Sequence, residues 1–149
     1  MITPEDIIDW CISNLPDVKS VNSWGETGIF YNPKDRFKRG VYVLTIKEKD
    51  GENDKASCLD RPDIFRVNIG IKRSTFIEYF NSTPPRPPKG GVIDMNFDFT
   101  RQRVLMPHPV YGWMNWVCML NPTETEFERL KGLIDEAYGL AVHKGARRK

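Results

Sequence analysis

The apolar positions at the two ends of the chain recur at helical spacing and predict two helices. Near the N-terminus these positions are Ile7, Ile8, Cys11, Ile12 and Leu15. Thr3 suits the cap of this helix, and Leu15-Pro16 ends it because the residue before a proline avoids helical backbone angles. Near the C-terminus, Thr123-Glu124-Thr125-Glu126 matches a capping box. The apolar face that follows predicts a long helix to about His143: Phe127, Leu130, Leu133, Ile134, Ala137, Tyr138 and Ala141.

Between the two helices, alternating and β-branched segments predict a sheet. Residues 18–24 and 28–31 predict a hairpin, and residues 40–46 predict a third strand. The clearest alternation runs from 65 to 71, where Arg66, Asn68 and Gly70 face away from the apolar set. We expect a half-buried strand of an antiparallel sheet there. Residues 74–80 predict a short helix, and residues 92–103 are a weaker strand candidate.

The segment 105–122 concentrates the unusual side chains of the chain. It holds two of the four tryptophans, one of the two histidines and one of the three cysteines. Pro107 and Pro109 stiffen the backbone on both sides of His108. From Trp116 onward the pattern predicts a buried strand, so we interpret Cys118 as an unreactive core thiol.

This order of elements predicts one α+β domain over residues 1–149. Its mostly antiparallel sheet packs against an N-terminal helix and a long C-terminal helix. Residues 81–91 contain four prolines and predict an exposed loop, and residues 144–149 predict a basic tail.

Composition and charge narrow the class of protein. The net charge is +2, but residues 1–60 hold 8 Lys and Arg against 11 Asp and Glu, whereas residues 61–149 hold 14 against 9. A basic half favours a nucleic-acid or anionic-ligand face, or only a solvated tail. Three scattered cysteines and the lack of a signal peptide or a long apolar run indicate a cytoplasmic protein that does not enter a membrane.

Several strings resemble known families. Trp116-Val117-Cys118-Met119-Leu120 and residues 133–142 resemble the MmcQ/YjbR-like proteins, which implies a frataxin-like α+β fold. Ala137 stands where that group usually has Ser, and Asn121-Pro122 also departs from it. A closer resemblance is to an uncharacterised bacterial family of unknown function, at residues 59–62, 65–70, 105–111 and 116–118. Neither resemblance transfers an activity to named residues.

The candidate site is a polar cluster on the open face of the sheet, where Arg66 and Asn68 project together. An arginine fork, an amide and an imidazole suit a carboxylate, phosphate or planar ligand. The expected ligand-binding residues are Arg61, Arg66, Asn68, His108, Tyr111 and Trp113. In the simpler alternative, Arg66 pairs with a surface acid and His108 packs between its prolines. If the site is catalytic, His108 is the best general base.

Three functions follow from these patterns. The preferred one is a binding module for nucleic acid or an anionic ligand, in which Arg101, Arg103 and the basic tail join Arg61 and Arg66. The second is a small-molecule enzyme or sensor with a pocket around His108, Arg66 and Asn68. The third is a protein-interaction module that uses the proline-rich loop. The sequence has no phosphate-binding or metal-ligand motif, so we expect neither a cofactor nor a metal.

Overall fold

The structure is a computed structural model that describes residues 1–148. Lys149, the last residue of the predicted basic tail, lies outside the described residues. The helices are α1 (Pro4–Asn14), α2 (Arg73–Phe80) and α3 (Glu124–Ala146). The strands are β1 (Val18–Ser23), β2 (Glu26–Tyr31), β3 (Val41–Lys47), β4 (Arg66–Gly70), β5 (Met106–Pro107) and β6 (Trp116–Leu120). Two short 3-10 turns are η1 (Pro33–Asp35) and η2 (Gly112–Met114).

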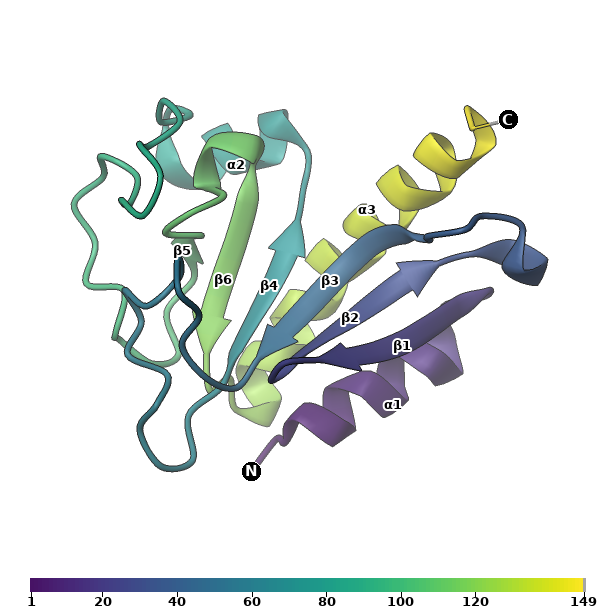
Figure 1. The fold of residues 1–149 in the computed structure, drawn as a ribbon, viewed down its shortest axis with the longest axis horizontal. Helices are drawn as coiled ribbons and strands as arrows, with labels where there is room; N and C mark the ends of the chain where they lie inside the picture. Colours follow the sequence, from purple (N-terminus) through teal and green to yellow (C-terminus); the bar gives the residue numbers. More distant parts are fainter. Residues whose placement is uncertain (149) are drawn as a thin grey trace.

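The six strands form one sheet in the order β1-β2-β3-β4-β6-β5, and each neighbouring pair is antiparallel. Helices α1 and α3 lie against the same face of this sheet (Figure 1). The predicted α+β class, with an N-terminal and a long C-terminal helix, is therefore confirmed. Across residues 1–148, no helix is long and apolar enough to span a membrane.

The main core lies between the sheet and these helices. Alternate strand residues point into it because successive side chains of a strand face opposite sides. On the two central strands they are Leu44, Ile46, Val67 and Ile69, and all four are almost fully buried. Side chains from all three helices pack against them: Ile7, Cys11, Phe76, Phe127, Leu130, Leu133, Ile134, Ala137 and Ala141.

A second core covers the other face of the sheet, but only at the β4-β6-β5 end. Cys118 and Leu120 of β6 pack there against Met106 of β5 and against side chains from irregular segments, namely Leu59, Ile93 and Phe99. Strand β4 is therefore buried on both faces rather than half-buried as predicted, and Arg66 and Asn68 are almost fully buried. The predicted strand at 92–103 is wrong. This segment forms turns and one isolated bridge at Gln102 that close the second core.

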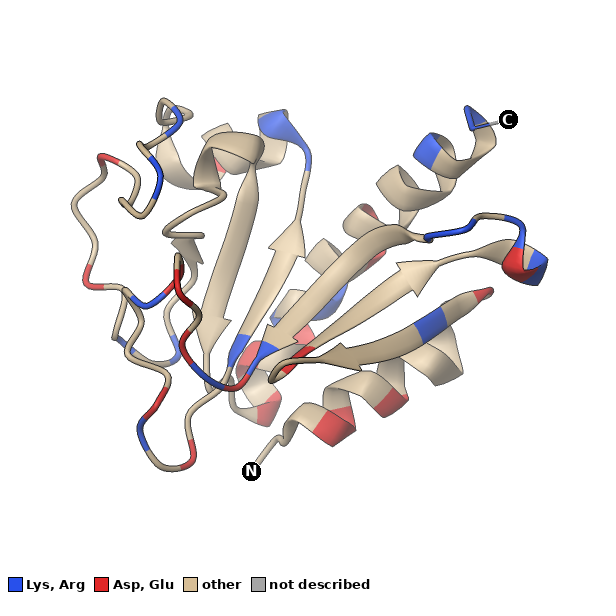
Figure 2. Cartoon of the chain, in the orientation of Figure 1, with Lys and Arg blue, Asp and Glu red and all other residues tan. Residues whose placement is uncertain are grey.

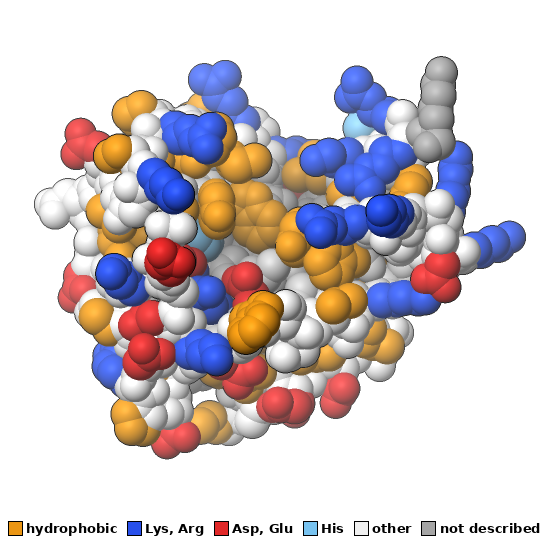
Figure 3. All heavy atoms as spheres, in the orientation of Figure 1, with side chains coloured by type: hydrophobic (Ala, Val, Ile, Leu, Met, Phe, Trp, Pro, Cys, Tyr) orange, Lys and Arg blue, Asp and Glu red, His pale blue; other side chains and the backbone are white. Residues whose placement is uncertain are grey.

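The β1-β2-β3 end of the same face is left bare. In Figure 3 this face is hollowed next to orange aromatic side chains. Tyr42 of β3 is 49% exposed there, and Trp24 at the β1-β2 turn is 89% exposed. The boundary between the covered half and the bare half of the sheet is where a pocket forms.

Both long helices begin with capping boxes, as the sequence predicts for α3. The Thr123 hydroxyl accepts from the Glu126 backbone N–H, and the Glu126 carboxylate accepts from the Thr123 backbone N–H. We expect Thr123→Ala to lower the free energy of unfolding by about 1 kcal/mol, because the Glu126 backbone N–H loses its hydroxyl acceptor. Urea denaturation measures this change. Thr125→Ala, at an exposed position two residues later, is the control and should change stability by less than about 0.5 kcal/mol. If Thr123→Ala and Thr125→Ala lower the stability equally, the Thr123 hydroxyl does not stabilise the start of α3.

Candidate functional site

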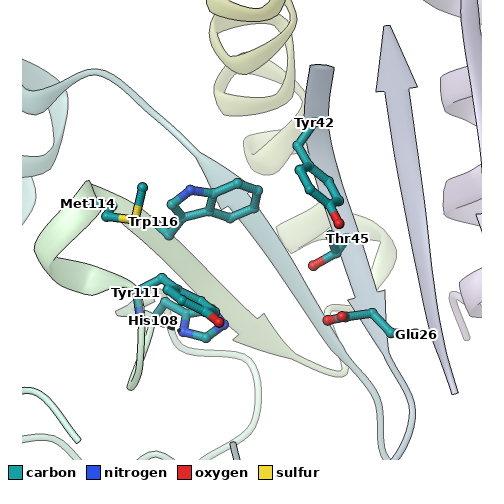
Figure 4. A pocket seen from close by; sticks show the side chains of 7 residues that line it. All are labelled: Glu26, Tyr42, Thr45, His108, Tyr111, Met114 and Trp116. Carbon is teal, nitrogen blue, oxygen red and sulfur yellow. Dashed lines mark hydrogen bonds between the residues drawn. The ribbon is translucent and has the colours of Figure 1, made fainter. Parts of the chain in front are cut away.

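The pocket at this boundary has a volume of about 250 Å³. One wall comes from β2 and β3, and the opposite wall comes from β6 and the segment that precedes it (Figure 4). The lining side chains are Glu26, Tyr42, Thr45, His108, Tyr111, Met114 and Trp116. Figure 4 shows the Glu26 carboxylate and the Thr45 hydroxyl directed from one wall toward the other wall.

A bulge in β3 creates the first wall. Ile29 pairs with Leu44 and Phe30 pairs with Tyr42, so Val43 is an extra residue in β3. An extra residue reverses the alternation of side chains. Tyr42 and Thr45, three positions apart, therefore line the same pocket.

A glycine makes room for the second wall. Gly70 of β4 pairs with Trp116 of β6. A Cβ atom at position 70 would lie 2.9 Å from the Trp116 indole, closer than packed carbon atoms come. The indole ring therefore lies across β4 and faces the Tyr42 ring, with a centroid distance of 6.4 Å and an angle of 82°.

Beneath the pocket, Arg66 is fully buried and all three of its guanidinium nitrogens contact protein atoms. It forms a bidentate ion pair with Asp54. It also donates to the Ser57 hydroxyl at 3.0 Å and to the Asn68 amide oxygen at 2.7 Å. The Asn68 amide then donates to the Thr45 hydroxyl at 3.0 Å, which leaves the Thr45 O–H directed to other acceptors. Arg66 therefore supports the pocket from below and does not line it.

Charge pairing keeps Arg66 and Asp54 ionised despite their burial. Burial alone would raise the pKa of Asp54, but the hydrogen bonds and positive charge of Arg66 lower it overall. In the same way, burial alone would lower the pKa of Arg66, and Asp54 raises it overall. The guanidinium charge is neutralised inside the protein, so it is not available to an anion in the pocket.

The hydrogen bonds of His108 define which of its nitrogens carries the proton. Nδ1 lies 3.0 Å from the backbone N–H groups of both Val110 and Tyr111. Because a backbone N–H can only donate, Nδ1 must accept, and a neutral ring then carries its proton on Nε2. This Nε2 atom lies 3.7 Å from Asp54 Oδ2 and 3.1 Å from Arg66 Nη2. In this tautomer two N–H donors, one on Arg66 Nη2 and one on His108 Nε2, lie close together. The Asp54 carboxylate lies near both of them and offsets this unfavourable contact.

His108 is consequently a neutral support for the pocket wall. Burial lowers the pKa of its imidazole well below 6.5, and the positive charge of Arg66 lowers it further, against a smaller opposite effect of Asp54. The lone pair of Nδ1 is already used by the turn that carries Tyr111. A general base needs a free lone pair within reach of the substrate, and this arrangement does not provide one.

The other residues of the predicted site lie apart from this pocket or under it. Arg61 donates to the backbone carbonyl groups of Ser57, Cys58 and Thr100, so it fastens loops together. Trp113 lies beneath the Arg86 guanidinium at 4.8 Å and lines a different cavity beside the proline-rich loop. Of the six predicted residues, only His108 and Tyr111 line the pocket, with Asn68 and Arg66 buried below it.

Sequence reasoning missed the residues of the opposite wall, Glu26, Tyr42 and Thr45. Tyr42 and Thr45 were hidden by the bulge, because a regular strand would place them on opposite faces. Glu26 gave no signal, since a lone acid near a turn is ordinary. Within residues 1–148, no three His, Cys, Asp or Glu side chains come together as metal ligands would. The arrangement is suited to binding through aromatic rings, hydroxyl groups and one carboxylate.

Comparisons with known proteins give a family without an activity. The model of a family of unknown function, DUF6194, matches residues 2–149. Comparison with curated proteins found no match. A crystal structure of a protein from Pseudomonas syringae was also found, and that protein is 12% identical in sequence to this chain. The match covers 94% of this chain and 99% of the other, with a TM-score of 0.48. The resemblance to MmcQ/YjbR-like proteins is not among these findings and stays a prediction.

The buried ion pair predicts a large cost for removing one partner. In Asp54→Asn, Arg66 would stay charged and fully buried without its counter-ion. We expect the free energy of unfolding to fall by about 3–5 kcal/mol, measured by urea denaturation. Asp35→Asn is the control, because it breaks the exposed ion pair with Lys19 and should cost about 1 kcal/mol or less. If the two variants cost the same, Asp54 does not neutralise a buried charge.

The lowered pKa of His108 predicts that the folded protein loses stability in mild acid. Its pKa is lower in the folded protein than the value of about 6.5 in an unfolded chain. Below pH 6.5 the unfolded chain therefore binds one more proton than the folded protein. The free energy of unfolding should fall by up to about 1.4 kcal/mol per pH unit as the pH decreases from 6.5 toward 5.

His108→Asn isolates this effect, because the Asn oxygen can accept in place of Nδ1 but does not titrate. Urea denaturation at several pH values should show that His108→Asn is less stable at neutral pH and has lost the slope. His143→Asn, at an exposed position, should keep the slope. A slope that persists in His108→Asn would show that another group is responsible.

Proposed function

The chain belongs to the family of unknown function DUF6194, and from the geometry of its pocket we propose that it binds a small planar molecule that carries hydrogen-bond donors. The observation that carries the proposal is the combination of three aromatic rings with the Glu26 carboxylate around one small cavity.

The aromatic rings supply the contact area for a planar ligand. Tyr42 and Trp116 line the pocket and meet edge-to-face, and Tyr111 adds a third ring beside His108. Tyr42, Tyr111 and Met114 are each about half exposed, at 49%, 48% and 50%, so a ligand would cover apolar surface that now faces water. Aromatic side chains with a few convergent polar groups are typical of small-molecule sites.

The polar groups favour a neutral or cationic ligand over an anion. Glu26 is the one residue of the lining set whose side chain is charged at neutral pH, since the pKa of His108 is lowered well below 6.5. A carboxylate accepts hydrogen bonds and repels anions. The predicted anion fork, Arg66, is already paired with Asp54. An anionic ligand held by Arg66 is therefore less well supported than a donor-bearing ligand held by Glu26.

Binding is also better supported than catalysis. Burial raises the pKa of the Cys118 thiol to about 12, so it is a poor nucleophile. His108 carries its proton on Nε2 and uses Nδ1 within its own turn. The protein-interaction alternative has less support, because Arg86 of the proline-rich loop stacks on Trp113. A cytoplasmic setting stays part of the proposal, supported by three unpaired cysteines within residues 1–148.

Two probes of the same shape and opposite charge test this proposal. Benzamidine is a planar cation with N–H donors, and benzoate is a planar anion with acceptors. We expect benzamidine to bind and benzoate to bind at least tenfold more weakly, because the Glu26 carboxylate faces the cavity. Isothermal titration calorimetry gives the affinities, and the Trp116 indole N–H signal in NMR reports whether the pocket is occupied.

Glu26→Gln should weaken benzamidine binding by roughly tenfold, the size expected when a charged hydrogen-bond acceptor becomes neutral. Glu48→Gln, which changes an exposed acid outside the lining set, should leave the affinity unchanged. Binding of neither probe, or tighter binding of benzoate, would overturn the proposal.

A further inference from the structure

A basic surface adjoins the pocket, and two segments distant in sequence build it. The first is the β2–β3 connection at residues 32–40, and the second is the C-terminal end of α3. Figure 2 shows both segments in blue on the same side of the molecule. We call their cationic residues the basic patch: Lys34, Arg36, Lys38, Arg39, Lys144, Arg147 and Arg148.

Specific contacts hold the two segments of the basic patch together. The Arg148 guanidinium donates to the Arg39 carbonyl at 2.8 Å, and Arg36 donates to the Arg148 carbonyl at 3.5 Å. Both guanidinium groups lie over the Phe37 ring, at 5.7 Å for Arg36 and 5.2 Å for Arg148. Gly145 lets the end of α3 pack closely on β2, because a Cβ there would lie 2.9 Å from the Tyr31 ring. The end of the chain up to Arg148 is therefore fastened to the β2–β3 connection.

The basic patch concentrates positive charge with almost no compensation. Asp35 is the one carboxylate within residues 32–40 and 143–148, and it is paired with Lys19 of β1. Like charges held close together repel each other, and a polyanion that covers them removes this repulsion and releases its own counter-ions.

The basic patch and the aromatic pocket are continuous. Phe30 near the end of β2 and Tyr42 near the start of β3 flank the basic connection, and their rings lie 4.4 Å apart. Tyr42 in turn lines the pocket. In Figure 3 the blue side chains border the hollow with the orange aromatic surface.

We propose that the ligand of the pocket is a base of a single-stranded nucleic acid, whose phosphates lie over the basic patch. This inference rests on the proposed function, because it places a planar base in the pocket against its aromatic rings. Adenine, cytosine and guanine carry amino groups that can donate to Glu26. Single strands bind proteins through base stacking on aromatic side chains beside a basic groove, whereas the bases of a duplex are already stacked.

A membrane surface fits the basic patch less well than a nucleic acid. Helices that insert at a membrane surface combine cations with large exposed apolar side chains. Within residues 32–40 and 143–148, none of the large apolar side chains is strongly exposed. Exposed aromatic side chains lie instead at the pocket and the β1-β2 turn, where bases could stack, and at Tyr79 on α2.

Adenosine and a single-stranded oligoadenylate of about ten nucleotides separate the two parts of the proposal. Adenosine should occupy the pocket with little dependence on salt. The oligoadenylate should bind more tightly, and the logarithm of its affinity should fall with the logarithm of the salt concentration by about 0.7 for each phosphate contacted. Fluorescence anisotropy measures the oligomer, and the Trp116 indole NMR signal follows both ligands.

A double variant, Lys38→Ser with Lys144→Ser, removes two cations and leaves the contacts around Phe37 intact. It should reduce the salt slope for the oligoadenylate by about 1.4, or 0.7 for each lost contact, without changing adenosine binding. Lys55→Ser with Arg129→Ser removes two exposed cations outside the basic patch and should change neither. Glu26→Gln should weaken both ligands, because it acts in the pocket.

The outcomes distinguish the two proposals. If adenosine binds but the oligomer binds no more tightly and shows no salt slope, this inference fails and the proposed function stands. If an abasic sugar-phosphate polymer of equal length binds as tightly as the oligoadenylate, the pocket does not take a base. Tighter binding to vesicles containing phosphatidylserine than to the oligomer would identify a membrane surface instead. If neither benzamidine nor adenosine binds, both proposals fail.

Discussion

The structure depends on one buried charge, the Arg66 guanidinium at the centre of β4. Its removal from water is unfavourable unless a counter-ion and hydrogen-bond acceptors surround it. Asp54 and Ser57 supply them from the long connection between β3 and β4, and Asn68 supplies another acceptor from β4 itself. The ion pair therefore attaches irregular chain to the sheet and closes the second core over half of one face. It also fixes Asn68, which orients the Thr45 hydroxyl at the pocket.

The same charge decides the chemistry of the pocket above it. Burial lowers the pKa of His108, and the guanidinium 3.1 Å from its Nε2 lowers that pKa further, so the imidazole stays neutral as a support for the Tyr111 turn. Because Asp54 neutralises Arg66 from below, the field in the cavity comes mainly from Glu26. An arginine that the sequence suggested as an anion receptor is thus paired inside the protein, which leaves Glu26 as the charged group among the pocket-lining residues. Arg66 points to the predicted side of the sheet, but because it is buried and paired with Asp54 it supports the pocket and does not bind an anion there.

Local patterns in the sequence predicted the helices, their caps and most strands, because periodicity and capping depend on neighbouring residues alone. The side of β4 that carries Arg66 was predicted correctly. Its burial was not, because the segments that cover it, such as residues 92–103, have no periodicity that reveals what they pack against. Tyr42 was missed because a bulge reverses the alternation. Comparing the net charges of the two halves of the chain did not reveal the basic patch. Four of its cations, Lys34, Arg36, Lys38 and Arg39, lie in the half that is acidic overall. That cluster of four cations in six residues was visible as a local run, but only the fold brings α3 to it.

The incomplete cover of the sheet explains why a site forms where it does. A strand face that is wholly covered has no access for a ligand, and a wholly bare face offers only a flat surface. Here the second core stops at β4, so Trp116 and Tyr111 rise from the covered half and face Tyr42 and Glu26 on the bare half. The β3 bulge shapes one pocket wall and the His108 turn shapes the other, and Arg66 links the two from below through His108 and Asn68. A preformed cavity of this kind lowers the entropy cost of binding, because few side chains need to be ordered when a ligand enters. The incomplete cover of the sheet, more than any single residue, creates the cavity on which the proposed binding rests.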